Sequence, residues 1–330
     1  MTTSKRKRLE KLLTGEKADR PGVALWRHWP GDDQDPVELA RSTIAWQAQF
    51  DWDFVKVSPD SSFCVECWGA RSRWVGNNEG NRQYVTHPIE MVDDWDTVRP
   101  VDPLSGRLGG QIQCLEILGQ EFAGETPFIQ TIFSPTSQLK YLAGKDRVLV
   151  EMRTHRAAVE KALQAITETT IRFLEAMKQT GVDGIFFAVQ LATPHDLTRG
   201  EYECFGRSYD LQILEAAADL FWFNLLHLHG QDAYFDLVAD YPVAAINWHD
   251  RESRPTLAEA RQQFAGGLVG GLRQWDTMLH GTPEDVRCEA ADAIAQTDGR
   301  GFILGTGCVT PITAPWGNLR AVRQAVEIYG

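Results

Sequence analysis

Residues 184–189 read Gly-Ile-Phe-Phe-Ala-Val, and residues 225–229 read Leu-Leu-His-Leu-His. Both runs are apolar and have the length of a buried strand. Between them, residues 211–224 show the apolar spacing of an amphipathic helix. A strand, a helix and a second strand favour parallel pairing, because a parallel connection needs a crossover of about a dozen residues or more. This stretch therefore predicts a β–α–β unit.

The same alternation runs along the whole chain. The predicted strands cover residues 23–26, 54–57, 128–133, 184–189, 225–229, 244–248, 268–272 and 302–304. The predicted helices cover residues 36–49, 137–142, 152–179, 211–224, 234–239, 256–264, 283–296 and 319–328. Eight strand–helix units favour an α/β fold of the (β/α)8 TIM-barrel type, and a doubly wound open sheet is the alternative.

The chain is longer than a minimal barrel requires. We expect one domain over residues 1–330, with two additions to the barrel. Residues 1–19 are predicted to form an N-terminal helical extension. Residues 74–127 are predicted to be an insertion after the second strand, in the form of a hairpin or a lid. The barrel places active sites at the carboxyl ends of its strands, so we looked for chemistry there.

Composition excludes several classes of function. Lys and Arg total 33 against 45 Asp and Glu, which gives a net charge of −12. A negative surface argues against binding of nucleic acid or anionic membranes. The chain has no apolar run of the ~20 residues that a membrane helix needs, and no secretion signal. Six cysteines are too few for a disulfide scaffold. We therefore expect a soluble cytoplasmic protein that has a small-molecule substrate and could form a homodimer.

Three residues form a candidate metal site. His227 and His229 end the fifth predicted strand, and residues two apart on a strand face the same side. Cys308 follows the eighth predicted strand, so it should stand at the same rim. Two imidazoles and one thiolate with an open fourth position are typical of catalytic zinc. The alternative is that the histidines are only hydrogen-bonded and that the thiol is a small buried apolar group.

Other polar side chains follow the predicted strands. Residues 26–29 read Trp-Arg-His-Trp, where Arg27 could hold an anionic group or stack between the aromatic rings. Asp60 could donate a proton, anchor a cationic ligand or simply stabilise a turn. His249 and Asp250 could add a metal ligand and a carboxylate behind the ligands.

Four motifs then show a resemblance to a known family. Residues 20–27 read Arg-Pro-Gly-Val-Ala-Leu-Trp-Arg, residues 53–60 read Asp-Phe-Val-Lys-Val-Ser-Pro-Asp, and residues 134–141 read Ser-Pro-Thr-Ser-Gln-Leu-Lys-Tyr. Residues 301–308 read Gly-Phe-Ile-Leu-Gly-Thr-Gly-Cys, and residues 315–319 read Pro-Trp-Gly-Asn-Leu. These segments resemble the opening arginine motif, the aspartate motif, the tyrosine motif and the closing motif of the uroporphyrinogen decarboxylase superfamily, whose fold is a (β/α)8 barrel.

The resemblance implies roles for single residues. Arg27 falls on the family's first functional arginine, Asp60 on the aspartate that holds the pyrrole NH groups of the substrate, and Tyr141 on the active-site tyrosine. Two departures weaken the likeness to true decarboxylases. Thr306 stands where the closing motif has its catalytic histidine, and Gly31 stands where the second arginine would be.

The histidine pair and the closing cysteine are similar to another branch of the superfamily, the cobalamin-linked methyltransferases. These enzymes hold zinc with an HxCG motif on the fifth strand and the cysteine of a closing GxGC. His227 and Cys308 match that pattern, and His229 replaces its first cysteine.

The resemblance therefore implies a zinc-dependent methyltransferase that moves a methyl group between a corrinoid, free or on a partner protein, and a thiol or a folate. The implied metal ligands are His227, His229 and Cys308, the catalytic residues Asp60, Tyr141 and Arg27, and the substrate-binding residues Arg27, Trp26, His28, Asp60 and Tyr141. A metal-free decarboxylase and a non-catalytic barrel that binds a small ligand remain the alternatives.

Overall fold

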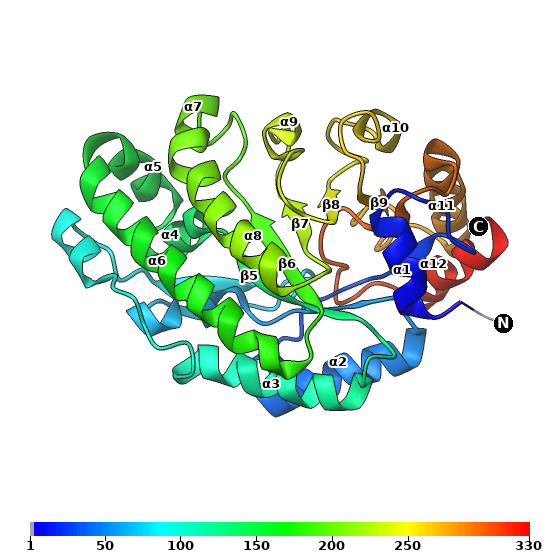
Figure 1. Cartoon of the computed structure of the whole chain (residues 1–330), viewed down its shortest axis with the longest axis horizontal. Helices are drawn as coiled ribbons and strands as arrows, with labels where there is room; N and C mark the ends of the chain where they lie inside the picture. Colours follow the sequence, from blue (N-terminus) through cyan, green and yellow to red (C-terminus); the bar gives the residue numbers. More distant parts are fainter. Residues whose placement is uncertain (1–2) are drawn as a thin grey trace.

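The computed structural model describes residues 3–330, and its centre is one sheet of eight parallel strands that curls into a barrel (Figure 1). The strands are β1 Gly22–Val23, β2 Val55–Val57, β5 Phe128–Phe133, β6 Gly184–Val189, β7 Leu225–Leu228, β8 Ala245–Trp248, β9 Gly267–Leu272 and β10 Phe302–Thr306. Their spatial order is β1-β10-β9-β8-β7-β6-β5-β2, and all the neighbouring pairs are parallel. The predicted (β/α)8 fold is confirmed, and each predicted strand overlaps one of these.

Helices surround the sheet. They are α1 Lys5–Leu13, α2 Pro36–Phe50, α3 Gly106–Phe122, α4 Pro135–Ala143, α5 Lys145–Thr154, α6 Arg156–Met177, α7 Arg199–Tyr202, α8 Ser208–Leu220, α9 Phe235–Val238, α10 Leu257–Ala260, α11 Pro283–Thr297 and α12 Trp316–Ile328. Local chemistry fixes several starts. At α2, the Asp35 carboxylate accepts hydrogen bonds from two backbone N–H groups of the first turn. Pro36, at the first position, has no N–H group and therefore needs no acceptor.

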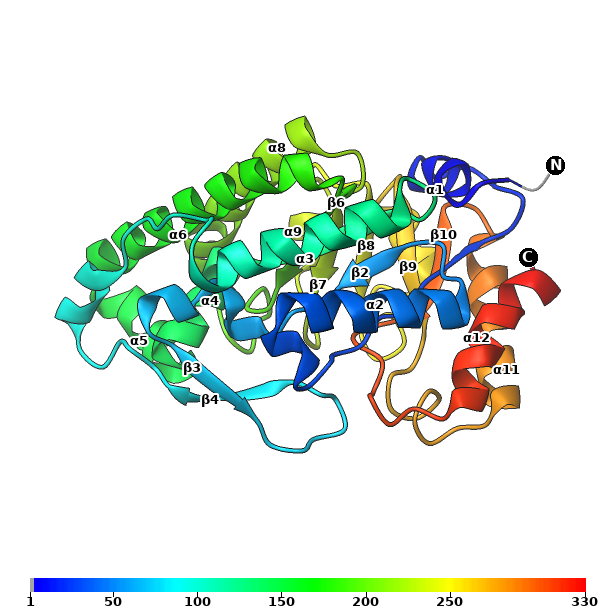
Figure 2. The same cartoon turned by 90° about the horizontal axis from the view of Figure 1, so that it is seen from below.

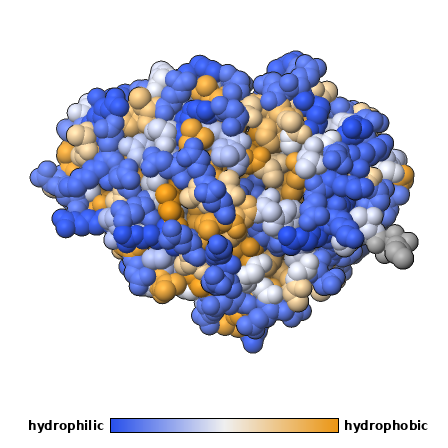
Figure 3. All heavy atoms as spheres, in the orientation of Figure 1, coloured by the Kyte–Doolittle hydropathy of each residue, from blue (hydrophilic) through white to orange (hydrophobic). Residues whose placement is uncertain are grey.

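The face of the molecule that is turned to the viewer in Figure 3 is mostly polar. Figure 3 shows one face covered mainly by hydrophilic side chains, with smaller groups of apolar side chains between them. Within residues 3–330, none of the helices combines the length and the apolar composition that a membrane crossing requires.

The bounds of most predicted helices differ from those in the structure, and two of the differences have a local cause. The predicted helix 152–179 is interrupted at His155, whose backbone leaves the helical region, so α5 and α6 are separate. The predicted helix 211–224 is too long, because α8 stops at Leu220 and Phe221 is already extended.

The stretch 74–127, expected as an insertion, contains two different parts. Its first part completes an antiparallel hairpin of β3 Arg71–Trp74 and β4 Arg82–Thr86, which projects from the barrel (Figure 2). Its second part contains α3, which lies beside α2 and connects β2 to β5 as a regular helix of the barrel. The sequence pattern did not predict α3. Residues 106–122 therefore belong to the barrel itself and not to an addition.

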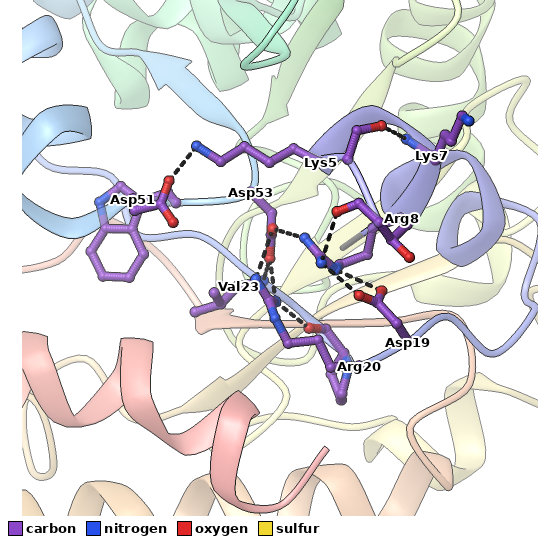
Figure 4. Close-up of polar contacts among 12 residues, drawn as sticks. Lys5, Lys7, Arg8, Asp19, Arg20, Val23, Asp51 and Asp53 are labelled. Carbon is purple, nitrogen blue, oxygen red and sulfur yellow. Dashed lines mark hydrogen bonds and ion pairs between the residues drawn. The ribbon is translucent and has the colours of Figure 1, made fainter. Parts of the chain in front are cut away.

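A buried ion-pair network joins the two ends of the sheet, β1 and β2 (Figure 4). The backbone N–H of Asp53 donates to the Val23 carbonyl at 2.9 Å, and the Val23 N–H donates to the Asp53 carboxylate at 2.8 Å. The same carboxylate, which is 0% exposed, accepts hydrogen bonds from Arg8 and Arg20 at 2.7 Å each. Arg8 comes from α1, so the N-terminal extension closes the barrel at this seam.

We expect Asp53→Asn to reduce the free energy of unfolding by about 3–5 kcal/mol, because it leaves two arginines facing a neutral amide in a buried site. Urea unfolding followed by circular dichroism measures the change. The matched control is Asp298→Asn, which breaks the pair with Lys17 at 3.8 Å. Asp298 is 81% exposed on its side chain, so the control should lose less than about 1 kcal/mol. Equal effects of the two substitutions would contradict the importance of the seam.

Candidate metal centre and its cavity

Three side chains meet at the carboxyl ends of the strands. His227 lies on β7, His229 follows directly after it, and Cys308 lies two residues beyond the end of β10. The Sγ atom of Cys308 is 3.8 Å from His227 Nε2 and 3.8 Å from His229 Nδ1. One ligand atom from each residue lies within 4.8 Å of the other two. The structure therefore brings together the residues that the sequence singled out as metal ligands.

Asn247 orients the first of these histidines. The register of β7 and β8 pairs His227 with Asn247, and His227 Nδ1 is 2.6 Å from Asn247 Oδ1. The amide Nδ2 of Asn247 donates to the backbone carbonyls of Val269 and Thr306 at 2.9 and 3.0 Å, so its Oδ1 must accept from the imidazole. His227 is thus protonated on Nδ1, and its Nε2 lone pair faces Cys308. Sequence reasoning missed Asn247, although it lies in a predicted strand next to the histidines.

His249 adds a third imidazole at the edge of the group. Its Nε2 lies 3.4 Å from His229 Nδ1, and its Nδ1 lies 3.7 Å from a carboxylate oxygen of Glu252. The neighbouring Asp250 is buried and accepts a hydrogen bond from the backbone N–H of Gly271 at 3.0 Å. The carboxylate beside the histidines therefore belongs to Glu252, whereas the sequence had suggested Asp250.

Burial and the imidazoles set the charge of this group. Burial raises the pKa of the Cys308 thiol, but contacts with His227, His229 and His249 hold that pKa well below its usual value. Burial lowers the pKa of His227. For His249, contacts with Cys308 and Glu252 outweigh burial and raise the pKa to about 10. Without a metal, the group therefore holds a thiolate beside an imidazolium.

The donor set fits a zinc ion. With Zn–S of about 2.3 Å and Zn–N of about 2.05 Å, tetrahedral ligands place sulfur and nitrogen roughly 3.6 Å apart. The two sulfur–nitrogen distances of 3.8 Å are close to that value. Two neutral imidazoles and a thiolate are also the ligand types that zinc prefers.

A cavity of about 510 Å³ opens beside this group. Its wall includes the three possible metal ligands and most of the predicted substrate-binding residues. The predicted substrate-binding residues that line the cavity are Trp26, His28, Asp60 and Tyr141. A volume of this size suits a small molecule.

Arg27 does not line the cavity. Its guanidinium lies 4.8 Å from the ring centroid of Trp29 and 5.7 Å from that of Trp46. Of the two roles considered for this arginine, the structure shows the stacked one.

Asp60 lines the cavity, but its carboxylate is already occupied. It forms an ion pair with Arg107, accepts a hydrogen bond from Gln34 Nε2 at 3.2 Å, and caps a short helical turn through the Ser62 N–H at 2.9 Å. An aspartate bonded in this way has little capacity left for the NH groups of a substrate.

The hairpin and Tyr141 form the outer wall of the cavity. Tyr84 of β4 stacks on Tyr141 with ring centroids 4.9 Å apart, and the Tyr141 hydroxyl donates to Gln190 Oε1 at 2.8 Å. At the hairpin tip, Glu79 accepts a hydrogen bond from Gln274 at 2.9 Å. The tip thus reaches the loop after β9.

Comparison with known proteins gives matches along almost the whole chain. The family model described as uroporphyrinogen decarboxylase (URO-D) matches residues 4–329, which confirms the resemblance of the motifs. The methylcobamide:CoM methyltransferase MtbA of Methanosarcina mazei is 24% identical over 303 residues, or 91% of this chain and 87% of that protein. The methylcobamide:CoM methyltransferase MtaA of Methanosarcina barkeri is 23% identical over 321 residues, or 95% and 90% of the two chains.

Solved structures show the same fold. A methyltransferase from Methanosarcina mazei superposes with a TM-score of 0.86 and 19% identity and covers 100% of both chains. A B12-independent methionine synthase from Shewanella sp. W3-18-1 superposes with a TM-score of 0.60 and 14% identity, over 96% of this chain and 97% of that one. At these identities the likeness supports the barrel architecture.

In metal-stripped protein, we expect Cys308 to lose its proton at a lower pH than an ordinary thiol, whose pKa is about 8.5, because its contacts with the three imidazoles lower its pKa. The ultraviolet absorbance of the thiolate measures this state, and Cys308→Ser should remove it. His249→Gln should move the titration to higher pH. Cys64 is a matched control, because burial raises the pKa of its thiol well above the usual value. A thiolate signal that Cys64→Ser removes, or that Cys308→Ser leaves unchanged, would contradict this account.

Proposed function

The chain belongs to the uroporphyrinogen decarboxylase (URO-D) family, and on that premise we propose that it is a corrinoid-linked methyltransferase. It moves a methyl group between a corrinoid and a small thiol, at a zinc ion held by His227, His229 and Cys308. The observation that carries this proposal is the approach of Cys308 Sγ to within 3.8 Å of one nitrogen from each histidine, beside the cavity. The relatives named as methylcobamide:CoM methyltransferases support it.

Zinc would supply a Lewis acid that lowers the pKa of an acceptor thiol, so that the thiolate is present at neutral pH. The residues of this chain prepare that site. Asn247 keeps the Nε2 lone pair of His227 free by accepting a hydrogen bond from its Nδ1–H. The imidazoles keep Cys308 deprotonated. A thiol is a better acceptor here than a folate because thiolate sulfur is a preferred ligand of zinc.

The reaction balances as a transfer of a methyl cation. The corrinoid would keep the electron pair of its cobalt–carbon bond, and the thiolate sulfur of the acceptor would supply the pair for the new bond to the methyl carbon. The proton of the thiol goes to solvent. A cavity of about 510 Å³ suits the small acceptor. The corrinoid would then meet the acceptor at the cavity mouth, presented by a partner protein or free.

Decarboxylation is less well supported. In this chain the family's aspartate, Asp60, is paired with Arg107, and Arg27 is stacked on tryptophans outside the cavity. The hydroxyl of Thr306, at the position of the catalytic histidine, donates to the Cys308 carbonyl. None of these groups is free to bind or protonate a pyrrolic carboxylate.

The hairpin is proposed as a lid over the acceptor. Its tip is attached by the Glu79–Gln274 hydrogen bond and by a backbone bond from Ile312 N–H to the Asn78 carbonyl at 2.8 Å. These bonds join the hairpin to the loops after β9 and β10. Their release would open the cavity without moving any strand of the barrel.

We expect protein purified without added metal to contain about one zinc per chain, as measured by mass spectrometry of the elements. His227→Ala and Cys308→Ala should each reduce zinc affinity at least about tenfold, because two ligands hold a metal far less tightly than three. Cys64→Ala is the control, since that cysteine lies outside the metal group, and it should keep its zinc.

Methyl transfer is tested with methylcobalamin and a small thiol, by the change in corrinoid absorbance and by detection of the methyl thioether. The two variants that bind zinc weakly, His227→Ala and Cys308→Ala, should lose activity. The control Cys64→Ala, which keeps its zinc, should keep its activity. A protein that lacks zinc but decarboxylates uroporphyrinogen would instead support the decarboxylase. A zinc-bound protein that methylates only folate would overturn the choice of acceptor.

A further inference from the structure

The cavity wall contains a carboxylate that has no cationic partner. Among the described residues, the acidic side chains that line the cavity are Asp60 and Glu79. Asp60 is paired with Arg107, whereas Glu79, which is half-buried, forms no ion pair with any of residues 3–330. Such a carboxylate is costly, because burial removes part of the water that stabilises its charge. Glu79 can therefore be stabilised by a proton from a molecule that fills the cavity.

The hairpin tip holds Glu79 on a rigid turn. Asn77 Nδ2 donates to Asn81 Oδ1 at 2.8 Å, and the Gly80 N–H donates to Asn77 Oδ1 at 2.8 Å. Gly80 has a φ of +80°, and a Cβ atom there would lie 2.7 Å from Ile312 Cγ2. Only glycine suits this conformation and this close approach. The position of Glu79 is thus fixed by the backbone on which it stands.

Two amides orient the carboxylate. Gln274 Nε2 donates to Glu79 Oε1 at 2.9 Å, and Asn81 Nδ2 donates to Glu79 Oε2. Both donors are neutral, so the charge of the carboxylate stays uncompensated. Because a carboxylate has about four lone-pair positions, each oxygen can still accept a proton from a ligand.

Glu79 lies near the metal group. Burial and the charge of Cys308 raise the pKa of Glu79, and the bond from Gln274 and the charges of His229 and His249 offset that rise only in part. A carboxyl group of raised pKa holds a proton more readily than an exposed glutamate does. The carboxylate without a cation thus lines the same cavity as the site where the proposed thiol reacts.

The charge of the cavity indicates what Glu79 does. A thiol enters as a neutral molecule and reacts as a thiolate. If its proton left for water, the closed cavity would gain a negative charge near the Cys308 thiolate and the Glu79 carboxylate. Like charges repel strongly where water is excluded. If Glu79 takes the proton, the total charge of the cavity does not change.

The other basic groups of the wall are less suitable. Burial and the charge of Lys56 lower the pKa of His28 to about 4, so this imidazole is a weak base. Burial lowers the pKa of Lys56 to about 7, but its Nζ packs 4.6 Å from the ring centroid of Phe186. His87 lies at the outer wall, where it stacks on the hairpin. Glu79 is the group whose charge and position agree with the task.

We propose that Glu79 is the catalytic base for the acceptor thiol, and that it holds the thiol proton while the hairpin is closed. This proposal rests on the proposed function, since a thiol acceptor is its premise. The S–H bond breaks, its electron pair stays on sulfur, and the proton goes to a carboxylate oxygen of Glu79. When the hairpin opens, the proton goes to solvent.

Proton counting tests this proposal without a methyl donor. 2-Mercaptoethanol is titrated into the protein as purified, by calorimetry at about pH 7 in PIPES and in TES, whose ionisation enthalpies differ. The change of the binding enthalpy with buffer gives the protons released per bound thiol. Glu79→Gln should release about one proton more than the wild type, and Glu79→Asp should release less than Glu79→Gln. The matched control Glu90→Gln, exposed and outside the cavity, should equal the wild type.

Other results would overturn the role of Glu79. The wild type and Glu79→Gln would then release equal numbers of protons, or the number would change in Lys56→Met instead. Loss of zinc from Glu79→Gln would show that the carboxylate holds the metal, and it would also contradict the proposal. Circular dichroism shows whether each variant is folded, and Glu79→Ala decides if Glu79→Gln does not fold.

The two proposals can fail separately. The expected difference in proton release without any methyl transfer would overturn only the methyltransferase. Methyl transfer with equal proton release would overturn only the role of Glu79. A protein that binds no thiol would overturn both.

A kinetic test uses 2-mercaptoethanol and the more acidic 2,2,2-trifluoroethanethiol as acceptors. Glu79→Gln should lower kcat for 2-mercaptoethanol about a hundredfold at neutral pH, because a positioned base contributes at least that much. The loss should be smaller for the more acidic thiol, and it should diminish as the pH rises. A merely structural role would slow both thiols equally at every pH, and that pattern would refute a base at position 79.

Discussion

The buried carboxylate of Asp53 closes the barrel, and the geometry of the cavity depends on that closure. β1 and β2 stand at the two ends of the strand order, where a ladder of hydrogen bonds is missing from the sheet. Asp53 replaces the ladder with its own backbone and side-chain bonds to Val23, and Arg8 and Arg20 neutralise it. A buried charge is tolerated only when its partners satisfy it fully, which this network does. The seam that it closes carries Trp26 on one side and Lys56 on the other.

The metal group depends on strand register in the same way. β7 and β8 pair so that His227 and Asn247 are opposite each other, and the amide of Asn247 is held in turn by carbonyls of β9 and β10. Polar atoms inside a barrel need such partners, because no water is available to them. The bonds also fix which nitrogen of His227 faces Cys308. The register of the two strands thus decides which nitrogen of His227 carries the proton and which one is free to bind a metal.

The sequence predicts much of this structure, and the exceptions have physical causes. The strand-length apolar runs predicted the barrel. The spacing of the two histidines and the position of Cys308 after the last strand predicted that these three possible metal ligands lie together. Helix α3 was missed because its glycines lower helix propensity. A Cβ atom at Gly119 would lie 1.9 Å from the Thr180 carbonyl oxygen, so glycine is required there by packing that the sequence does not display. Arg27 lies beyond the end of β1 at Val23, so the alternation of a strand does not decide where its side chain lies. In the sequence, Lys56 looks like an ordinary polar residue of a strand. Only the structure shows that it forms no ion pair with an acidic side chain of residues 3–330.

The charges of the cavity and of the whole chain point in opposite directions. The protein has a net charge of −12, yet the cavity contains Lys56 without an acid, and a zinc ion bound by one thiolate and two neutral imidazoles would keep a net positive charge. With a second thiolate in place of His229, that excess would vanish. Because the attraction between charges grows as the dielectric constant falls, a buried positive site can hold an anion inside a negative protein.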